Sequence, residues 1–137
     1  FIACLHTQYD ASDIAAGLCI RESGSGKLQV YGKRGGTYAM SSGLNYSSPT
    51  GSNSGITGWS SSGNNDHWTT HLIWVKYVDD ASHRIISMSQ DGYSWMQMVS
   101  LATNDYLVPD QIGILVNNVD SGTETQVGAT FLHWKQY

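Results

Sequence analysis

The sequence predicts an all-β domain built as an antiparallel β-sandwich of about nine or ten strands. Short runs of apolar or alternating residues recur at spacings of about ten residues, and Gly, Ser, Asn and Asp separate them. No segment shows the period of an amphipathic helix. The length of 137 residues is typical of one domain, so residues 1–137 are predicted to form a single sandwich.

The predicted strands follow one another along the whole chain. Each is a run of apolar or alternating residues bounded by turn residues. Residues 67–77 are apolar on both alternating faces in their middle, which favours a central strand covered on two sides. The predicted strands are residues 1–7, 15–22, 27–33, 37–40, 67–77, 83–89, 95–99, 111–117 and 127–135.

Residues 41–66 depart from this pattern, because Ser, Gly and Asn dominate them. We predict a long surface loop there, with one short strand at residues 55–59. A loop longer than about 15 residues in a compact domain is usually functional or disordered. This segment is therefore a candidate location for a binding site.

Residues 90–92, Gln-Asp-Gly, are predicted to form a tight hairpin turn between the strands at 83–89 and 95–99. Gly92 tolerates the positive φ angle of such a turn, and Asp91 can accept hydrogen bonds from nearby backbone N–H groups. The two flanking strands are then expected to pair antiparallel.

Cys4 and Cys19 lie in consecutive strand-like runs. If these runs pair antiparallel around residue 11 or 12, the two cysteines lie nearly opposite and can form a cross-strand disulfide. Two buried thiols are nevertheless expected, with the disulfide as the alternative, because free cysteine packs as a small hydrophobic residue. A pair of cysteines without further ligands is a poor metal site.

Four segments together resemble one family. They read AAGLCIRESGSGKLQVYGK (15–33), RIISMSQDGYSW (84–95), VPDQIGILVNN (108–118) and ATFLHWKQY (129–137). In this order they are similar to the concanavalin A-like lectin/glucanase jelly-roll family, in particular to its small accessory modules with a strand–Asp-Gly–x-x-Trp hairpin. The final strand departs from the family, which prefers an acidic residue where this chain has Leu132-His133-Trp134. The resemblance implies a jelly roll that belongs to a longer protein, with the strand that normally precedes Phe1 missing.

Composition narrows the range of partners. Charged residues make up 13% of the chain, about half the usual share, and the net charge is -4. No basic stripe is available to neutralise phosphates, which argues against nucleic acid. No apolar run approaches the roughly 20 residues of a membrane span. The uncharged polar surface is typical of secreted and virion β-proteins, so an extracellular or virion-surface location is expected.

Catalytic and metal-binding patterns are weak. A retaining glycosidase of this fold needs two carboxylates about 5 Å apart. The only glutamates, Glu22 and Glu124, have no carboxylate two residues away, so no enzyme activity is expected. His67 and His71 fall in a predicted strand, where positions four apart are about 13 Å apart, too far to share zinc. No cofactor is expected; calcium is the alternative, through turn aspartates at 79, 80, 110 and 120.

Tryptophans give the best indication of a ligand, because sugars stack on aromatic rings and bond to amide and carboxylate groups. Trp68, Trp74 and Trp95 are also suited to the core, and for Trp74 and Trp95 the core is the expected location. Trp59 lies in the polar loop and is the best candidate for an exposed ring. The predicted ligand-binding residues are Trp59, Asn64, Asn65, Asp66 and Trp68.

These observations favour a non-catalytic module that binds glycan or cell-surface polysaccharide within a larger extracellular or virion protein. The alternative is a structural domain of a phage-like particle, such as a capsid decoration, head fibre or tail spike, with other protein chains as partners. The fold alone does not choose between them, since one sandwich architecture serves many functions.

Overall fold

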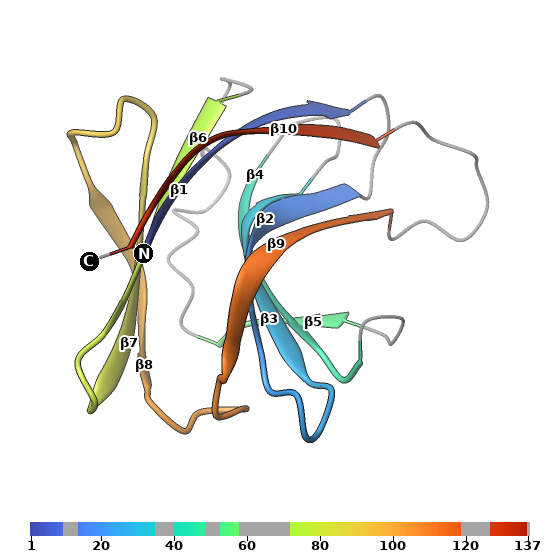
Figure 1. The fold of residues 1–137 in the computed structure, drawn as a ribbon, viewed down its shortest axis with the longest axis vertical. Helices are drawn as coiled ribbons and strands as arrows, with labels where there is room; N and C mark the ends of the chain where they lie inside the picture. The colour runs from blue at the N-terminus through green and yellow to red at the C-terminus, as the bar shows by residue number, and fades with distance from the viewer. Residues whose placement is uncertain (10–13, 35–39, 49–52, 58–71, 119–126, 137) are drawn as a thin grey trace.

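The computed structural model describes residues 1–9, 14–34, 40–48, 53–57, 72–118 and 127–136. These residues form two antiparallel sheets of five strands each and no helix, which confirms the predicted all-β sandwich (Figure 1). No membrane-spanning helix occurs among them. The strands are β1 (Ile2–Tyr9), β2 (Ile14–Arg21), β3 (Leu28–Arg34), β4 (Met40–Tyr46), β5 (Asn53–Gly55), β6 (Leu72–Asp79), β7 (His83–Ser89), β8 (Met96–Ala102), β9 (Gln111–Asn118) and β10 (Val127–Lys135).

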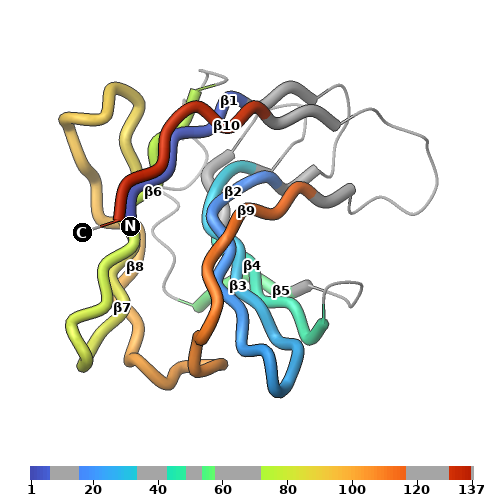
Figure 2. Tube along the Cα trace, viewed as in Figure 1, coloured from blue at the N-terminus to red at the C-terminus, as the bar shows by residue number. Residues whose placement is uncertain are grey.

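The first sheet has the strand order β10-β1-β6-β7-β8, and the second has the order β5-β4-β3-β2-β9. The predicted hairpin between β7 and β8 is confirmed by their antiparallel pairing. β6 is the central strand of the first sheet, as its two apolar faces predicted. Ile2 pairs with Lys135, so β1 and β10 lie side by side and the two ends of the traced chain meet (Figure 2).

The predicted strand boundaries are wrong in one region. β4 was expected to end at residue 40, where the polar loop begins, but it spans Met40–Tyr46. Leu44 and Tyr46 are buried and alternate with Asn45, which gives the two-residue period of a strand. The Ser-rich surroundings obscured that period in the sequence. β5 also lies slightly before its predicted position at residues 55–59.

Inward-facing side chains from both sheets form the main hydrophobic core. Strict alternation along β6 buries Ile73, Val75 and Tyr77 and turns Trp74 and Lys76 to the outer surface. Full burial of a large apolar side chain contributes about 1.5–3 kcal/mol to folding. The core also includes Ala3, Leu5, Leu18, Ile20, Tyr31, Ile56, Ile86, Met88, Met98, Val99, Leu101 and Leu107.

A charged side chain crosses the space between the sheets. Arg84 of β7 is 0% exposed. Its Nη1 donates to Oε1 of Gln29 on β3 at 2.8 Å, and its Nε and Nη2 donate to the Ala102 carbonyl at 3.4 and 3.3 Å. Nη2 also donates to the Asp105 carbonyl. The guanidinium therefore joins the first sheet, the second sheet and the segment after β8.

Gln29 extends this network within the second sheet. The Tyr31 hydroxyl donates to Gln29 Oε1 at 2.7 Å, and Gln29 Nε2 donates to Asn45 Oδ1 at 2.7 Å. Burial raises the pKa of Tyr31 far above its usual range, an effect that the Arg84 charge only partly offsets. Tyr31 therefore stays a neutral hydrogen-bond donor, and the buried polar groups satisfy one another.

Two glycines face each other where β2 and β3 pair. Gly17 and Gly32 are cross-strand partners. A Cβ on Gly17 would lie 2.2 Å from the Tyr31 carbonyl oxygen, and one on Gly32 would lie 2.1 Å from the Ala16 carbonyl oxygen. Both distances are far below van der Waals contact. The two backbones approach so closely that only glycine fits at either position.

The expected pair of buried thiols is confirmed, because Cys4 and Cys19 are both free and buried; the alternative, a cross-strand disulfide, is not formed. β1 and β2 do not pair with each other; they belong to different sheets. Cys4 and Cys19 alternate with core residues on their strands, so each faces outward from its own sheet, with the whole sandwich between them. Burial raises the pKa of Cys19 to about 11, which keeps this thiol protonated at neutral pH.

Candidate functional site

The residues predicted to bind ligand do not fall in the described part of the chain. Trp59, Asn64, Asn65, Asp66 and Trp68 all lie within residues 58–71. Their assignment to a site stays a prediction. Two other features of the described residues are candidate sites: the outer surface of the first sheet and a cleft between the sheets.

The outer surface of the first sheet carries two tryptophans that were expected in the core. Trp74 points outward because it alternates with the buried Ile73 and Val75. Trp95 immediately precedes β8, and its ring covers the outward-facing Lys76. Both tryptophans are partly exposed, so the expectation that they fill the core is wrong.

These rings are held by neighbours of two kinds. Lys76 Nζ lies 4.7 Å from the centroid of the Trp95 ring, within the range of a cation–π interaction. The His133 ring lies 5.5 Å from the Trp74 ring, with the ring planes inclined by 50°. Trp74 and Lys76 are two residues apart on the same face of β6, about 7 Å along the strand. We call Trp74, Lys76, Trp95 and His133 the outward aromatic face.

The turn between β7 and β8 packs against this face and is fixed by Asp91. Asp91 Oδ1 accepts hydrogen bonds from the N–H groups of Ser94 and Tyr93 at 2.7 and 2.8 Å, and from the Ser89 hydroxyl at 2.8 Å. These bonds, led by that of the Ser94 N–H, hold the pKa of Asp91 well below its usual range. The predicted capping role of Asp91 in the turn is confirmed.

Gly92 connects the turn to Trp74. Its φ angle is +78°, as predicted, and a Cβ at this position would lie 3.0 Å from Cε2 of the Trp74 indole. The sequence feature Asp-Gly therefore serves two purposes: it makes the turn and it lets the turn lie on the tryptophan ring.

We expect Gly92→Ala to reduce the free energy of unfolding by about 2–3 kcal/mol, from the strained φ together with the contact to Trp74. Gly26→Ala is a matched control, because Gly26 has φ of +74° and open space around it. Its expected loss is about 1 kcal/mol. Urea unfolding measures both, and equal losses would show that the contact with Trp74 contributes nothing.

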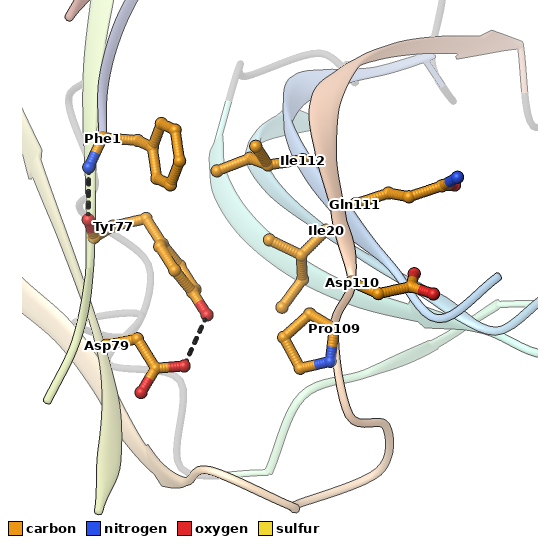
Figure 3. A pocket seen from close by; sticks show the side chains of 8 residues that line it. All are labelled: Phe1, Ile20, Tyr77, Asp79, Pro109, Asp110, Gln111 and Ile112. Carbon is orange, nitrogen blue, oxygen red and sulfur yellow. Dashed lines mark hydrogen bonds between the residues drawn. The ribbon is translucent and has the colours of Figure 1, made fainter. Parts of the chain in front are cut away.

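The second candidate is a cleft of about 260 Å³ between the two sheets (Figure 3). The rings of Phe1 and Tyr77 form its wall on the first sheet. Reciprocal backbone hydrogen bonds of 2.9 Å between these two residues fix their register. On the second sheet the wall consists of Ile20, Ile112 and Pro109 (Figure 3).

Polar groups lie at the margin of the cleft. The Tyr77 hydroxyl donates to Asp79 Oδ2 at 3.2 Å, so this exposed carboxylate is held beside the apolar walls. Asp79 Oδ1 accepts from the Ala81 N–H at 3.0 Å. The side chains of Asp110 and Gln111 extend away from the Tyr77 side of the cleft (Figure 3). Burial is the main reason why the pKa of Tyr77 is raised far above its usual range, so Tyr77 remains a neutral donor.

Glu22 and Asp110, distant in sequence, come together at the base of β2 and β9. Glu22 accepts from the Ser25 hydroxyl and from the Val108 N–H, and Asp110 accepts from the hydroxyl and the N–H of Ser23. These hydrogen bonds lower the pKa of both carboxyl groups. Both carboxylates fasten loops, and neither has the raised pKa of a general acid.

Turn aspartates of the described chain act mainly as local caps. Asp80 Oδ1 accepts from the N–H groups of Ser82 and His83 at 2.9 and 2.6 Å. Within the described ranges, no three His, Cys, Asp or Glu side chains are grouped closely enough to hold a metal ion. His67, His71 and Asp120, which the sequence raised for metal binding, lie outside these ranges.

The described strands form a two-sheet antiparallel β-sandwich, and solved structures of other proteins have a similar fold. A functionally unknown protein from Saccharomyces cerevisiae matches with a TM-score of 0.66 and 15% identity, over 98% of this chain and 65% of its own. The GH43 protein BlXynB (mutant K247S) from Bacillus licheniformis matches with a TM-score of 0.66 and 16% identity, over 95% of this chain and 25% of its own. The chain therefore spans less than two thirds of either structure. No family model and no curated protein matches it.

Sequence reasoning missed both candidate sites of the described chain. The alternation in residues 72–77 showed that β6 has two faces, but Trp74 appeared the better core residue because of its size. The cleft depends on Phe1 and Tyr77 on one sheet facing Ile20 and Ile112 on the other. Nothing local in the sequence signals that juxtaposition, because it arises from the packing of two sheets.

Proposed function

We propose that this domain is a non-catalytic module that binds glycan through the outward aromatic face. The observation that carries the proposal is the pair of partly exposed tryptophans, Trp74 and Trp95, at neighbouring positions on one face of the first sheet. Indole rings present flat apolar surfaces on which the C–H faces of sugar rings stack. A folded, low-charge surface with such rings suits a neutral saccharide.

Polar groups around the rings support the same ligand class. Gln97 and His133 are exposed on the strands that flank the tryptophans, and Tyr93, at the tip of the β7–β8 turn, is 89% exposed. Amide, imidazole and phenol groups supply the directed hydrogen bonds that distinguish sugar hydroxyls. The loop residues Trp59, Asn64, Asn65, Asp66 and Trp68 are proposed to add to this binding surface.

The chemistry of the carboxylates supports binding rather than hydrolysis. Glycoside hydrolysis uses one carboxyl group with a raised pKa as the acid and a second as nucleophile or base. Glu22 and Asp110 are near each other, but hydrogen bonds lower the pKa of both. We therefore propose no catalytic role for them.

We further propose that the sandwich is a concanavalin A-like jelly roll within a larger extracellular or virion protein. The hairpin supports this type, because Asp91, Gly92 and Trp95 occupy the positions that the resemblance implies, and each has a structural role. The partial coverage of both solved structures is consistent with a module of a longer chain.

A glycan array on the purified domain, with and without EDTA, tests the proposal. We expect saturable binding to one glycan class, weakened roughly tenfold or more in Trp95→Ala. Trp134→Ala is the control, because Trp134 is an exposed tryptophan on the edge strand β10, outside the outward aromatic face, and packs against Phe1. Loss of binding with EDTA would indicate calcium. Equal weakening by both substitutions, or a blank array with folded protein, would contradict the proposal.

A second candidate function, protein–protein contact in a structural assembly, is favoured by one observation. The edge strands β9 and β10 expose several large apolar side chains: Ile114, Val116, Phe131, Leu132 and Trp134. Exposed apolar groups gathered in this way often mark interaction surfaces. A blank glycan array together with concentration-dependent association in sedimentation would move the assignment to this role.

A further inference from the structure

The cleft between the sheets is a separate site from the outward aromatic face. β6 supplies both, because Trp74 and Lys76 point outward from it while Tyr77 points inward to the cleft. A ligand in the cleft therefore lies against a different set of described residues from the outward aromatic face. The chemistry of its walls indicates a different class of ligand.

The walls of the cleft form a slot with one aromatic and one aliphatic side. Phe1 and Tyr77 face Ile20, Ile112 and Pro109 across it (Figure 3). Phe1 and Tyr77 are tilted against each other by 47° with ring centroids 6.5 Å apart, so both rings are fixed by mutual packing. Apolar walls of this kind take up a flat ring or an aliphatic chain with little polar surface.

Charged groups at the margin of the cleft restrict the kind of ligand that can bind there. The charged side chains among the eight lining residues are two aspartates, Asp79 and Asp110, and the ammonium group of Phe1 is engaged by the Tyr77 carbonyl. Asp79 stands beside the aromatic wall, where the Tyr77 hydroxyl and the Ala81 N–H each occupy one of its oxygens, and each oxygen retains acceptor capacity. The Asp79 carboxylate repels an anionic group placed beside it, whereas a cationic group finds a positioned partner.

We propose that this cleft binds a small apolar amine, with its ring or chain between the two walls and its ammonium group on Asp79. The apolar part is buried against Phe1, Tyr77, Ile20 and Ile112. The ammonium group donates to the carboxylate, which the Tyr77 hydroxyl keeps in place. The charge of Asp79 selects amines over acids of the same size.

Three probes of matched shape test this selection: phenethylamine, 2-phenylethanol and 3-phenylpropionate. Titrations are followed by NMR of the Ile20 and Ile112 methyl groups, with Ile85 on the outer face of β7 as the control methyl. We expect phenethylamine to shift the Ile20 and Ile112 signals and to bind about tenfold more tightly than 3-phenylpropionate, with the alcohol in between. Equal affinities for the three probes, or shifts at Ile85 alone, would overturn the proposal.

Two variants test separately the contribution of the Asp79 charge and the contribution of the aromatic wall to amine binding. Asp79→Asn keeps the acceptor for the Ala81 N–H and removes the charge, so we expect a loss of about fivefold in phenethylamine affinity and little change for the alcohol. Tyr77→Phe keeps the ring, and we expect affinity within about threefold of the original, since only the bond that positions Asp79 is lost. An unchanged amine preference in Asp79→Asn would overturn the role of the carboxylate. Neither result changes the interpretation of the glycan array, so the amine proposal and the glycan proposal are tested independently.

Discussion

Alanine at Gly17 or Gly32 is expected to lower the free energy of unfolding by about 3 kcal/mol or more, or to prevent folding. The added methyl group would lie 2.1–2.2 Å from a backbone carbonyl oxygen of the partner strand. A flexible side chain can move away from such a clash, but a backbone carbonyl in a paired strand cannot. β2 and β3 would have to separate at the centre of the second sheet.

Gly113→Ala is the matched control for this prediction. Gly113 lies on β9 and pairs with Cys19 of β2, in the same sheet, but a Cβ there would meet nothing within 4 Å. The control is expected to be neutral or to stabilise the domain by up to about 1 kcal/mol, because alanine restricts the unfolded chain. Chemical denaturation of the three variants measures the difference. Similar stability of Gly17→Ala and Gly113→Ala would contradict the close approach of the two backbones.

Arg84→Met is expected to destabilise the domain by about 3–5 kcal/mol. Methionine fills a similar volume but leaves Gln29 Oε1 and the carbonyls of Ala102 and Asp105 without their charged donor. The Tyr31 hydroxyl still donates to Gln29, so part of the network survives. The loss therefore reflects mainly the hydrogen bonds by which the buried guanidinium ties Gln29 to the Ala102 and Asp105 carbonyls.

Arg21→Met serves as the control for Arg84. Arg21 donates to Gln111 Oε1 at 3.0 Å in an exposed hydrogen bond. Its replacement is expected to change stability by less than about 1 kcal/mol. Thermal and urea unfolding compare the two variants. If both lose the same amount, the buried guanidinium is not the tie between the sheets that its hydrogen bonds indicate.

Much of the fold was predictable because strands carry a local signal. The alternation in β3 and β6 and the Asp-Gly turn before β8 can be recognised from consecutive residues alone. The structure has these elements where they were predicted. β4 was misplaced because the small polar residues around Leu44 and Tyr46 weakened its period. The local residue pattern predicts where a strand lies in the sequence, but it does not predict which other strand pairs with it.

Pairing between distant strands explains the remaining errors. A disulfide between Cys4 and Cys19 was an alternative because their strands are consecutive, but the chain changes sheets between them. Trp74 was assigned to the core by its size, whereas the inward face of β6 belongs to Ile73, Val75 and Tyr77. Both points concern which face or sheet a strand joins, a property that depends on the whole assembly. The predicted residues at 59–68 lie outside the described chain and remain predictions.

The position of β1 has a consequence for the order of events during synthesis. β1 is made before β2 to β5, yet its two neighbours in the sheet are the later strands β6 and β10. Its hydrogen-bonding edges stay without these partners until β6 and then β10 emerge, so the first sheet is completed only after β10 has been made. Such long-range pairings give slow folding, in milliseconds to seconds, and leave an apolar strand exposed to other nascent chains in the meantime.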